Sequence, residues 1–147
     1  SDNPDIAEIM DEIVVEAIRL GYRHIDCATA YQNEEVVGRA IKKALKTGMV
    51  VREDLFVLSK LWNKHMNPEE VIPACEDSLR MLGLDYLDMY VVHWPWPNFH
   101  VPGASGDEVN DHAVPYIHED FMKIWDKMTE LKRSGKSIKW ERSKSMH

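Results

Sequence analysis

The sequence predicts an α/β fold that forms a partial (β/α)8 TIM barrel of about three to four βα units. Helical and strand-like hydrophobic patterns alternate along the 147 residues, and repeated βα units form either a doubly wound sheet or a barrel. The two phosphate-binding loops common in doubly wound sheets, GxGxxG and GxxxxGK[ST], are missing from this sequence. A barrel is therefore favoured, although a complete one typically takes about 250 residues.

The first two helices are predicted from apolar residues at helical spacing. The first follows Asn3 as N-cap and Pro4 at the first helical position, and it ends at Gly21. The second runs from about residue 33 to residue 46, with Gly48 near its end. The apolar positions are Ile6, Ile9, Met10, Ile13, Val14, Ala17 and Ile18 in the first helix, and Val37, Ala40, Ile41, Ala44 and Leu45 in the second.

Two further helices are predicted in the second half of the chain. Asn67, Pro68 and the two glutamates that follow favour a helix N-terminus, and Gly83 ends this third helix. Pro73 inside it predicts a kink, because a proline removes one backbone hydrogen bond. The fourth helix ends at Gly135. Its apolar face consists of Phe121, Ile124, Trp125, Met128 and Leu131.

Three β-rich runs lie between the helices: YRHIDCA, LFVLSKLW and YLDMYVVHW. They are too apolar for strands with one solvated face, so buried parallel strands are expected. Residues 95–117 have no sustained period and predict a long loop. Residues 136–147 form a basic, divergent tail in which only SIKW has strand character. Residues 1–147 are expected to form one partial barrel domain.

The composition argues against several classes of partner. The formal net charge is −7, and no more than two Lys or Arg residues are consecutive, which argues against nucleic acid. No apolar run approaches the roughly 20 residues that span a bilayer, and the acidic N-terminus lacks an apolar leader, so no membrane association is expected. Cys27 and Cys75 lack the spacing of a zinc site, and they are predicted to be buried thiols of a cytoplasmic protein.

Three polar side chains end the predicted strands, and a fourth follows in a loop. In a (β/α)8 barrel the reacting groups lie at the carboxyl ends of the strands. This sequence has Asp26, Lys60 and His93 at those ends, with Tyr31 in the loop after the first strand. Each has an ordinary alternative role: a turn carboxylate, a solvated lysine, a core histidine and a packing tyrosine. A single shared site accounts for all four together.

A shared site would be suited to acid catalysis on a carbonyl group. A phenol is a weak acid near neutral pH, but a neighbouring ammonium such as that of Lys60 stabilises the phenolate. Asp26 would orient Lys60, and His93 would hydrogen-bond the carbonyl oxygen. Tyr31 is therefore predicted to be the acid.

Three segments carry specific motifs: GYRHIDCATAYQNEEVVGRAI, LFVLSKLWN and LGLDYLDMYVVHWP. The first contains G-x-R-x-x-D with a tyrosine five residues after the aspartate. The second contains a strand that ends S-K-x-W, and the third contains L-D-x-Y-x-x-H-W-P. From about Asp5 to Gly135 the chain resembles the N-terminal half of the aldo-keto reductase family, of the aldose and xylose reductase kind.

The resemblance implies a metal-free (β/α)8 barrel that reduces small-molecule aldehydes and ketones with NADPH. Hydride passes to the carbonyl carbon, and a tyrosine protonates the oxygen. The family's catalytic tetrad falls on Asp26, Tyr31, Lys60 and His93. Asp26 is also expected to bind the cofactor. Trp62 and Trp94 match tryptophans of the substrate pocket, although each also fits as a large core aromatic, and residues 96–117 match the first substrate loop.

The resemblance is incomplete at both ends of the chain. The family's N-terminal hairpin and first strand, with its G-x-G-T-x motif, are not recognisable. After SGKSI, the family's Ser-Asn-Gln residues, which bind the nicotinamide amide of NADP, are not recognisable either. The family's Lys-Ser/Thr and Arg motif, which binds the 2′-phosphate of NADP, is also not recognisable. RSKS at residues 142–145 resembles that motif only faintly. Unpaired strand edges predict that the chain forms a homo-oligomer through these edges, aggregates, or is one piece of a longer chain. The isolated chain is expected to bind NADPH weakly and to be nearly inactive.

Two alternative functions remain open at this point. A truncated or spliced member of the family would act as a non-catalytic interaction module, which the exposed sheet edges support. A metal-dependent barrel hydrolase would use His24, Asp26 and His93, but no further ligand occupies a convincing position in the sequence.

Overall fold

The computed structural model describes residues 4–97, 110–111 and 113–135. Its helices and strands are α1 (Pro4–Arg19), β1 (His24–Asp26), α2 (Glu34–Lys46), β2 (Phe56–Leu61), α3 (Pro68–Leu82), β3 (Met89–Val92) and α4 (His118–Ser134). Short 3-10 helices occupy Thr29–Tyr31, Arg52–Asp54 and Asn63–His65. The predicted alternation of helices and strands is confirmed. The predicted cap Asn3, most of the 95–117 loop, the SIKW strand and the RSKS segment lie outside the described residues.

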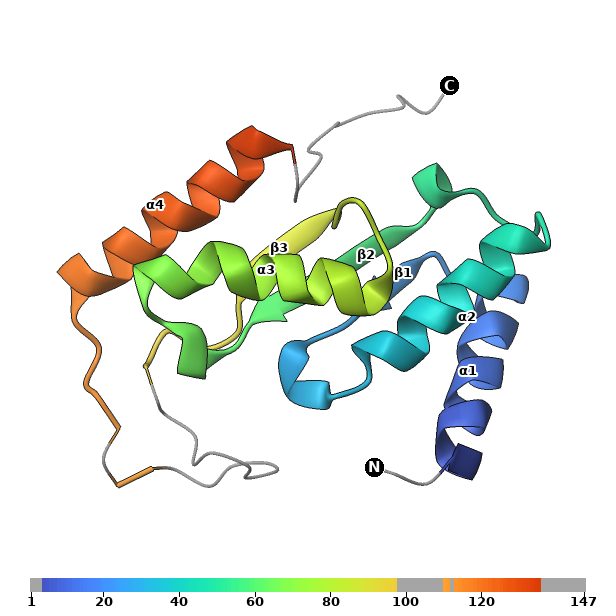
Figure 1. Ribbon diagram of the computed structural model, residues 1–147, viewed down its shortest axis with the longest axis horizontal. Coiled ribbons are helices and arrows are strands. Elements are labelled where there is room, and N and C mark those ends of the chain that lie inside the picture. The colour runs from blue at the N-terminus through green and yellow to red at the C-terminus, as the bar shows by residue number, and fades with distance from the viewer. Residues whose placement is uncertain (1–3, 98–109, 112, 136–147) are drawn as a thin grey trace.

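The three strands form one parallel sheet in the order β1-β2-β3. Asp26 of β1 is the register partner of Leu58, which in turn pairs with Met89 of β3. Helices α2 and α3 lie side by side over one face of this sheet (Figure 1), with α1 packed against α2 and α4 packed against α3. This arrangement gives the sheet one covered face and one face that no described helix covers.

The core lies between the sheet and the helices. Side chains alternate along β2, so Val57, Ser59 and Leu61 are buried against the helices, while Phe56 and Lys60 face the other way. The expectation of fully buried strands is not met, because Phe56 on β2 and Met89 on β3 are 39% and 37% exposed and two of the three residues of β1 are exposed. Most of β2 is nevertheless buried. The strands β1 and β3 are the edges of the described sheet, and therefore lack a neighbour on one side.

The helix α3 begins and ends as its sequence predicts. The side-chain oxygen of Asn67 accepts a hydrogen bond from the backbone N–H of Glu69 at 3.2 Å, and Gly83 takes a left-handed conformation with φ of 65° after the last turn. The helix is continuous through Pro73, so the predicted kink does not divide it. Pro73 is exposed, so water can reach the Glu69 carbonyl that loses its helical partner.

The helix α4 buries a narrower face than its sequence predicts. Ile124, Met128 and Leu131 are buried, whereas Trp125 is exposed. Trp125 follows Ile124 directly, and a neighbour in sequence lies about 100° further around a helix. Trp125 is therefore an apolar position that lies outside the buried part of the helix surface.

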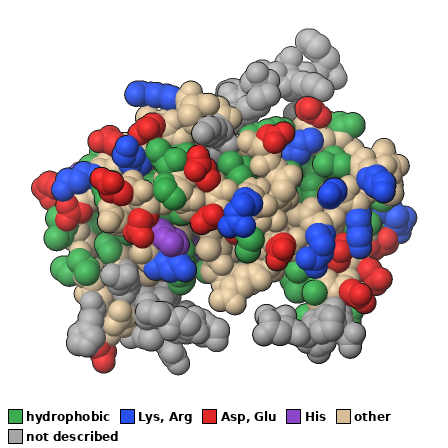
Figure 2. Space-filling model, viewed as in Figure 1, with side chains coloured by type: hydrophobic (Ala, Val, Ile, Leu, Met, Phe, Trp, Pro, Cys, Tyr) green, Lys and Arg blue, Asp and Glu red, His purple; other side chains and the backbone are tan. Residues whose placement is uncertain are grey.

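The surface over the helices carries interspersed charges. On the face shown in Figure 2, acidic and basic side chains lie next to one another over the helices. Arg19 pairs with Glu16, Arg80 with Asp77 and Lys123 with Asp120, each three residues apart on one helix. Such exposed pairs contribute little to stability. None of the described helices is both long and apolar enough to cross a membrane.

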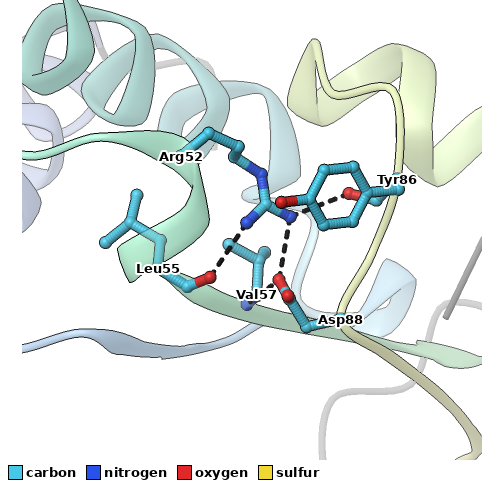
Figure 3. A network of polar contacts seen from close by, with 5 residues as sticks. All are labelled: Arg52, Leu55, Val57, Tyr86 and Asp88. Atoms are coloured by element: carbon cyan, nitrogen blue, oxygen red, sulfur yellow. Dashed lines mark hydrogen bonds and ion pairs between the residues drawn. The ribbon is translucent and has the colours of Figure 1, made fainter. Parts of the chain in front are cut away.

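The amino ends of β2 and β3 are joined by a polar network centred on Arg52 (Figure 3). Its guanidinium donates to the carbonyls of Leu55 and Tyr86, each at 2.9 Å, and to a carboxylate oxygen of Asp88 at 2.8 Å. The same carboxylate oxygen accepts from the backbone N–H of Val57 at 2.8 Å. The guanidinium also lies 4.0 Å from the centre of the Tyr86 ring. This network fixes β2 relative to β3, and so fixes the opposite, carboxyl ends of the strands.

Candidate active site at the carboxyl end of the sheet

Lys60 is the centre of the candidate site. It lies near the end of β2 on the uncovered face of the sheet, and Asp26 at the end of β1 lies on the same face. The ammonium of Lys60 donates hydrogen bonds to a carboxylate oxygen of Asp26, to the phenol oxygen of Tyr31 at 3.1 Å and to the carbonyl oxygen of Cys27 at 3.1 Å. The alternative in which Lys60 extends into solvent is therefore wrong.

The three side chains differ in their access to solvent. The Lys60 side chain is 13% exposed, whereas that of Asp26 is 56% exposed and Tyr31 is 50% exposed. Burial of the Lys60 side chain disfavours its charge, but the hydrogen bonds to Asp26 and Tyr31 together favour the charge more strongly. The pKa of Lys60 is therefore raised above its ordinary value. A charged ammonium is thus held beneath a phenol that a ligand can reach.

His93 completes the group of four predicted residues. It follows β3, where its backbone N–H donates to the carbonyl of Leu61 at 3.0 Å. Its ring centre lies 5.9 Å from that of Tyr31, with the ring planes perpendicular, and 5.2 Å from the centre of the Trp62 ring system. The structure therefore brings Asp26, Tyr31, Lys60 and His93 to one place.

Aromatic rings extend from His93 along the edge of the site. Trp94 is nearly parallel to the His93 ring, with centres 6.2 Å apart and 18° between the planes, and Trp62 contacts His93 from another side. Trp96, which the sequence analysis did not single out, lies 6.3 Å from Trp94 and is exposed. The repeated pattern in HWPWP is a signal that would have identified it. Such rings offer an apolar wall to a substrate.

The carbonyl of Cys27, the third acceptor of the Lys60 ammonium, was not predicted from the sequence. A backbone group leaves no mark in a residue pattern, so only the geometry identifies it. Cys27 itself is buried, as predicted, and so is Cys75. Burial, and less strongly the carboxylates of Glu34 and Asp26, raises the pKa of the Cys27 thiol to about 12. Near neutral pH this thiol is therefore protonated and a poor nucleophile.

His24 has a packing role on the uncovered face of the sheet. Its ring centre lies 4.7 Å from that of Phe56, its register partner on β2. Within the described ranges, no group of three or more His, Cys, Asp or Glu residues is placed to hold a metal ion. The hydrolase alternative built on His24, Asp26 and His93 therefore gains no support from the geometry.

The groups around Lys60 fit the reacting end of a nicotinamide cofactor and a carbonyl compound. Asp26 pairs with Lys60 and is still largely exposed, so its carboxylate retains capacity to accept a hydrogen bond from a cofactor hydroxyl or amide. The phenol of Tyr31 and the ring of His93 lie on the same side and can donate to a carbonyl oxygen.

Comparisons with known proteins agree with this arrangement. The model of the aldo/keto reductase family matches residues 6–140. Aldo-keto reductase family 1 member C13 of Mus musculus is 45% identical over 123 residues, which cover 81% of this chain and 36% of that protein. A D/L-glyceraldehyde reductase of Hypocrea jecorina is 44% identical over 125 residues, which cover 82% of this chain and 37% of that protein.

Solved structures of this family resemble the fold as well. An aldo-keto reductase of Bombyx mori in complex with NADP has a TM-score of 0.73 at 36% identity, covering 93% of this chain and 40% of that chain. The aldose reductase of Schistosoma japonicum has a TM-score of 0.73 at 38% identity, covering 93% and 44%. The predicted partial barrel is thereby confirmed.

The similarity covers most of this chain but only part of each relative. The chain spans little more than a third of the length of the curated relatives, with 36% and 37% for the two named above. The matched segment contains the four clustered residues and the parallel sheet that carries them. The chain belongs to the aldo/keto reductase family.

Proposed function

We propose that this protein reduces aldehydes and ketones to alcohols with NADPH, and that Tyr31 protonates the carbonyl oxygen. The observation that carries the proposal is the Lys60 ammonium, which donates to the phenol oxygen of Tyr31 and to Asp26 at once. A cation in contact with a phenol stabilises the negative charge that develops as the phenol gives up its proton. The exposed phenol is accessible to a substrate.

The contacts of the four side chains support a proposed role for each. Tyr31 donates its phenol proton to the substrate oxygen, and Lys60 stabilises the resulting phenolate. Asp26 keeps Lys60 charged and directed at Tyr31. His93 donates a hydrogen bond to the carbonyl oxygen and fixes its direction, while Trp62 and Trp94 hold the rest of the substrate against an apolar wall.

NADPH, when bound, supplies the hydride that reduces the carbonyl carbon. Asp26 is the described residue proposed to hold the cofactor near its reacting end. Two relatives support this choice of cofactor: the Bombyx mori structure contains NADP, and a similar protein of Malus domestica is named NADP-dependent D-sorbitol-6-phosphate dehydrogenase. We propose that the 147 residues act as one partial barrel domain of a cytoplasmic protein.

The experiment that tests the proposal is NADPH oxidation with a reactive aromatic aldehyde, measured for the wild type beside Tyr31→Phe. The expected result is turnover in the wild type, well below that of a complete family member, and a loss of at least about a hundredfold in the variant. Unchanged turnover in Tyr31→Phe would contradict the assigned role. Turnover equal to that of a complete reductase would contradict the expected weak binding of NADPH.

A second candidate function is that of a non-catalytic interaction module. It is favoured by the uncovered face of the sheet, where the apolar side chains of Phe56 and Met89 are 39% and 37% exposed. Unpaired strand edges also favour a homo-oligomer. Light scattering that finds a discrete oligomer, combined with no binding of NADPH, would support this function over reduction.

A further inference from the structure

The loop of residues 27–33, which carries Tyr31, is fixed to the sheet at its start. It connects β1 to α2. The backbone N–H of Cys27 donates to the carbonyl of Leu58 on β2 at 2.9 Å. The first residue of the loop is thereby an extension of the sheet, and Tyr31 lies four residues beyond it.

Further along, the loop holds a conformation that needs support. The hydroxyls of Thr29 and Ser78 share a hydrogen bond of 3.3 Å, which joins the loop to α3. Gln32, directly after Tyr31, is the only described non-glycine residue with a positive φ, at 53°. Left-handed backbone in such a residue costs free energy and persists only where the surrounding structure enforces it. A second anchor is therefore needed after Gln32.

Glu34 supplies that anchor from the covered face of the sheet. The hydroxyl of Ser59 donates to a carboxylate oxygen of Glu34 at 2.6 Å. The exposed fractions of Ser59 and Glu34 are 0% and 5%. Ser59 immediately precedes Lys60 on β2, and its side chain points to the opposite face of the sheet. One strand therefore holds both the cation that contacts Tyr31 and the hydroxyl that fixes the loop bearing Tyr31.

A carboxylate in this place is otherwise unfavourable. Burial of an ionised group is costly unless hydrogen bonds and charge compensate for it. Glu34 is the first residue of α2, where the helix dipole favours a negative charge, and Ser59 satisfies one of its oxygens. An apolar residue at position 34 would cover the same surface without this desolvation cost. The Glu34–Ser59 hydrogen bond is therefore better explained by a role in fixing the position of the loop.

We propose that the buried Glu34–Ser59 hydrogen bond is a positioning pair that holds the Tyr31 phenol against the Lys60 ammonium. The pair lies on the face of the sheet opposite to the Lys60 side chain, and it acts through the backbone of residues 31–34. The inference rests on the proposed function only for its catalytic consequence. The structural consequence, loss of the contact between Tyr31 and Lys60, is measurable without turnover.

The test compares Ser59→Ala with the control Val57→Ala in the full chain. Val57 lies on the same strand and the same face as Ser59 and is equally buried, but a valine side chain has no hydroxyl that could donate to Glu34. The readout is nuclear Overhauser contact between the Tyr31 ring and the Lys60 ε-methylene, with the Tyr31 signals assigned through Tyr31→Phe. We expect the contact to disappear in Ser59→Ala and to persist in Val57→Ala.

Two further variants distinguish loss of the Glu34–Ser59 hydrogen bond from general unfolding. Glu34→Gln keeps an acceptor of the same shape and is expected to retain the contact. If Ser59→Ala does not fold, Ser59→Cys replaces it, since a thiol is a weak donor of similar shape, and the contact is expected to weaken. Retention of the contact in the folded Ser59 variant, or its equal loss in Val57→Ala, would overturn the proposal.

The kinetic arm separates this inference from the proposed function. Displacement of Tyr31 is expected to lower kcat at least about tenfold with little change in KM, because binding of the substrate depends on other groups. If the contact is lost in Ser59→Ala while the wild type keeps the contact but shows no turnover, the result would support the positioning pair and count against the reductase. A change in KM alone would overturn the positioning role.

Discussion

The two ends of β2 each carry a cation paired with a carboxylate from a neighbouring strand segment, but the two pairs differ in what surrounds them. At the amino end, Arg52 and Asp88 have side chains 14% and 16% exposed, and both bond to backbone groups. At the carboxyl end, Lys60 is equally buried but Asp26 and Tyr31 are half exposed. The first pair is enclosed, and the second is open to a ligand.

This difference separates stability from chemistry within one strand. One oxygen of the Asp88 carboxylate accepts from both the guanidinium and the Val57 N–H, and the side chain is only 16% exposed, so a ligand has little access to it. The Lys60 ammonium instead donates one of its hydrogen bonds to the exposed phenol of Tyr31. In (β/α)8 barrels the carboxyl ends of the strands hold the reacting groups, and the amino ends mainly stabilise the fold. Substitutions at the two ends of β2 test whether the amino end mainly stabilises the fold and the carboxyl end holds the reacting groups.

The largest expected effect is on stability at the amino end. Asp88→Ala leaves the largely buried Arg52 guanidinium without its carboxylate partner and the Val57 N–H without its acceptor, and should lower the free energy of unfolding by about 3 kcal/mol. Asp26→Ala, the matched change at the carboxyl end, should cost about 1 kcal/mol because Asp26 is largely exposed. Denaturant unfolding measures both. Equal losses would remove the distinction between the two ends.

A smaller effect is expected from alkaline pH. The pKa of Lys60 is raised in the folded protein, so its ion pair with Asp26 stabilises the fold fully below the ordinary lysine pKa of about 10.4. This contribution is lost as the pH rises through the higher pKa of the folded state. The stability difference between the wild type and Lys60→Met should therefore shrink between about pH 9 and pH 12. A difference independent of pH would show that the charge of Lys60 adds no stability.

The smallest expected effect concerns the reactivity of Cys27, which follows the open site but is buried. Cys27 follows Asp26 directly, yet it is buried, and its pKa is raised to about 12. A thiol-specific disulfide reagent at neutral pH should therefore react with neither Cys27 nor Cys75 in the native chain, and with both after denaturation. Rapid reaction of native Cys27 would mean that the carboxyl end is open on both faces of the sheet.

The sequence predicts the parts of this molecule that depend on local patterns. The limits of α3 follow from Asn67, Pro68 and Gly83, and the four clustered side chains follow from their places near strand ends. The carbonyl of Cys27 and the Ser59–Glu34 pair were not predicted, because such contacts depend on how the strand, loop and helix pack. The partial exposure of β1 and β3 was missed for a similar reason: the apolar pattern of a strand does not reveal whether a neighbour covers it.

A charged Lys60 connects Asp26 to Tyr31 at the open end of the sheet, and the proposed chemistry depends on this connection. It is tested most directly by nitrogen-15 NMR of the lysine ammonium groups, with Lys60 assigned through Lys60→Met. We expect a Lys60 signal that is protected from exchange with water and that shifts in both Tyr31→Phe and Asp26→Asn, because both partners accept hydrogen bonds from Lys60. A Lys60 signal that behaves like those of the exposed lysines Lys43 and Lys123 in all three proteins would contradict it.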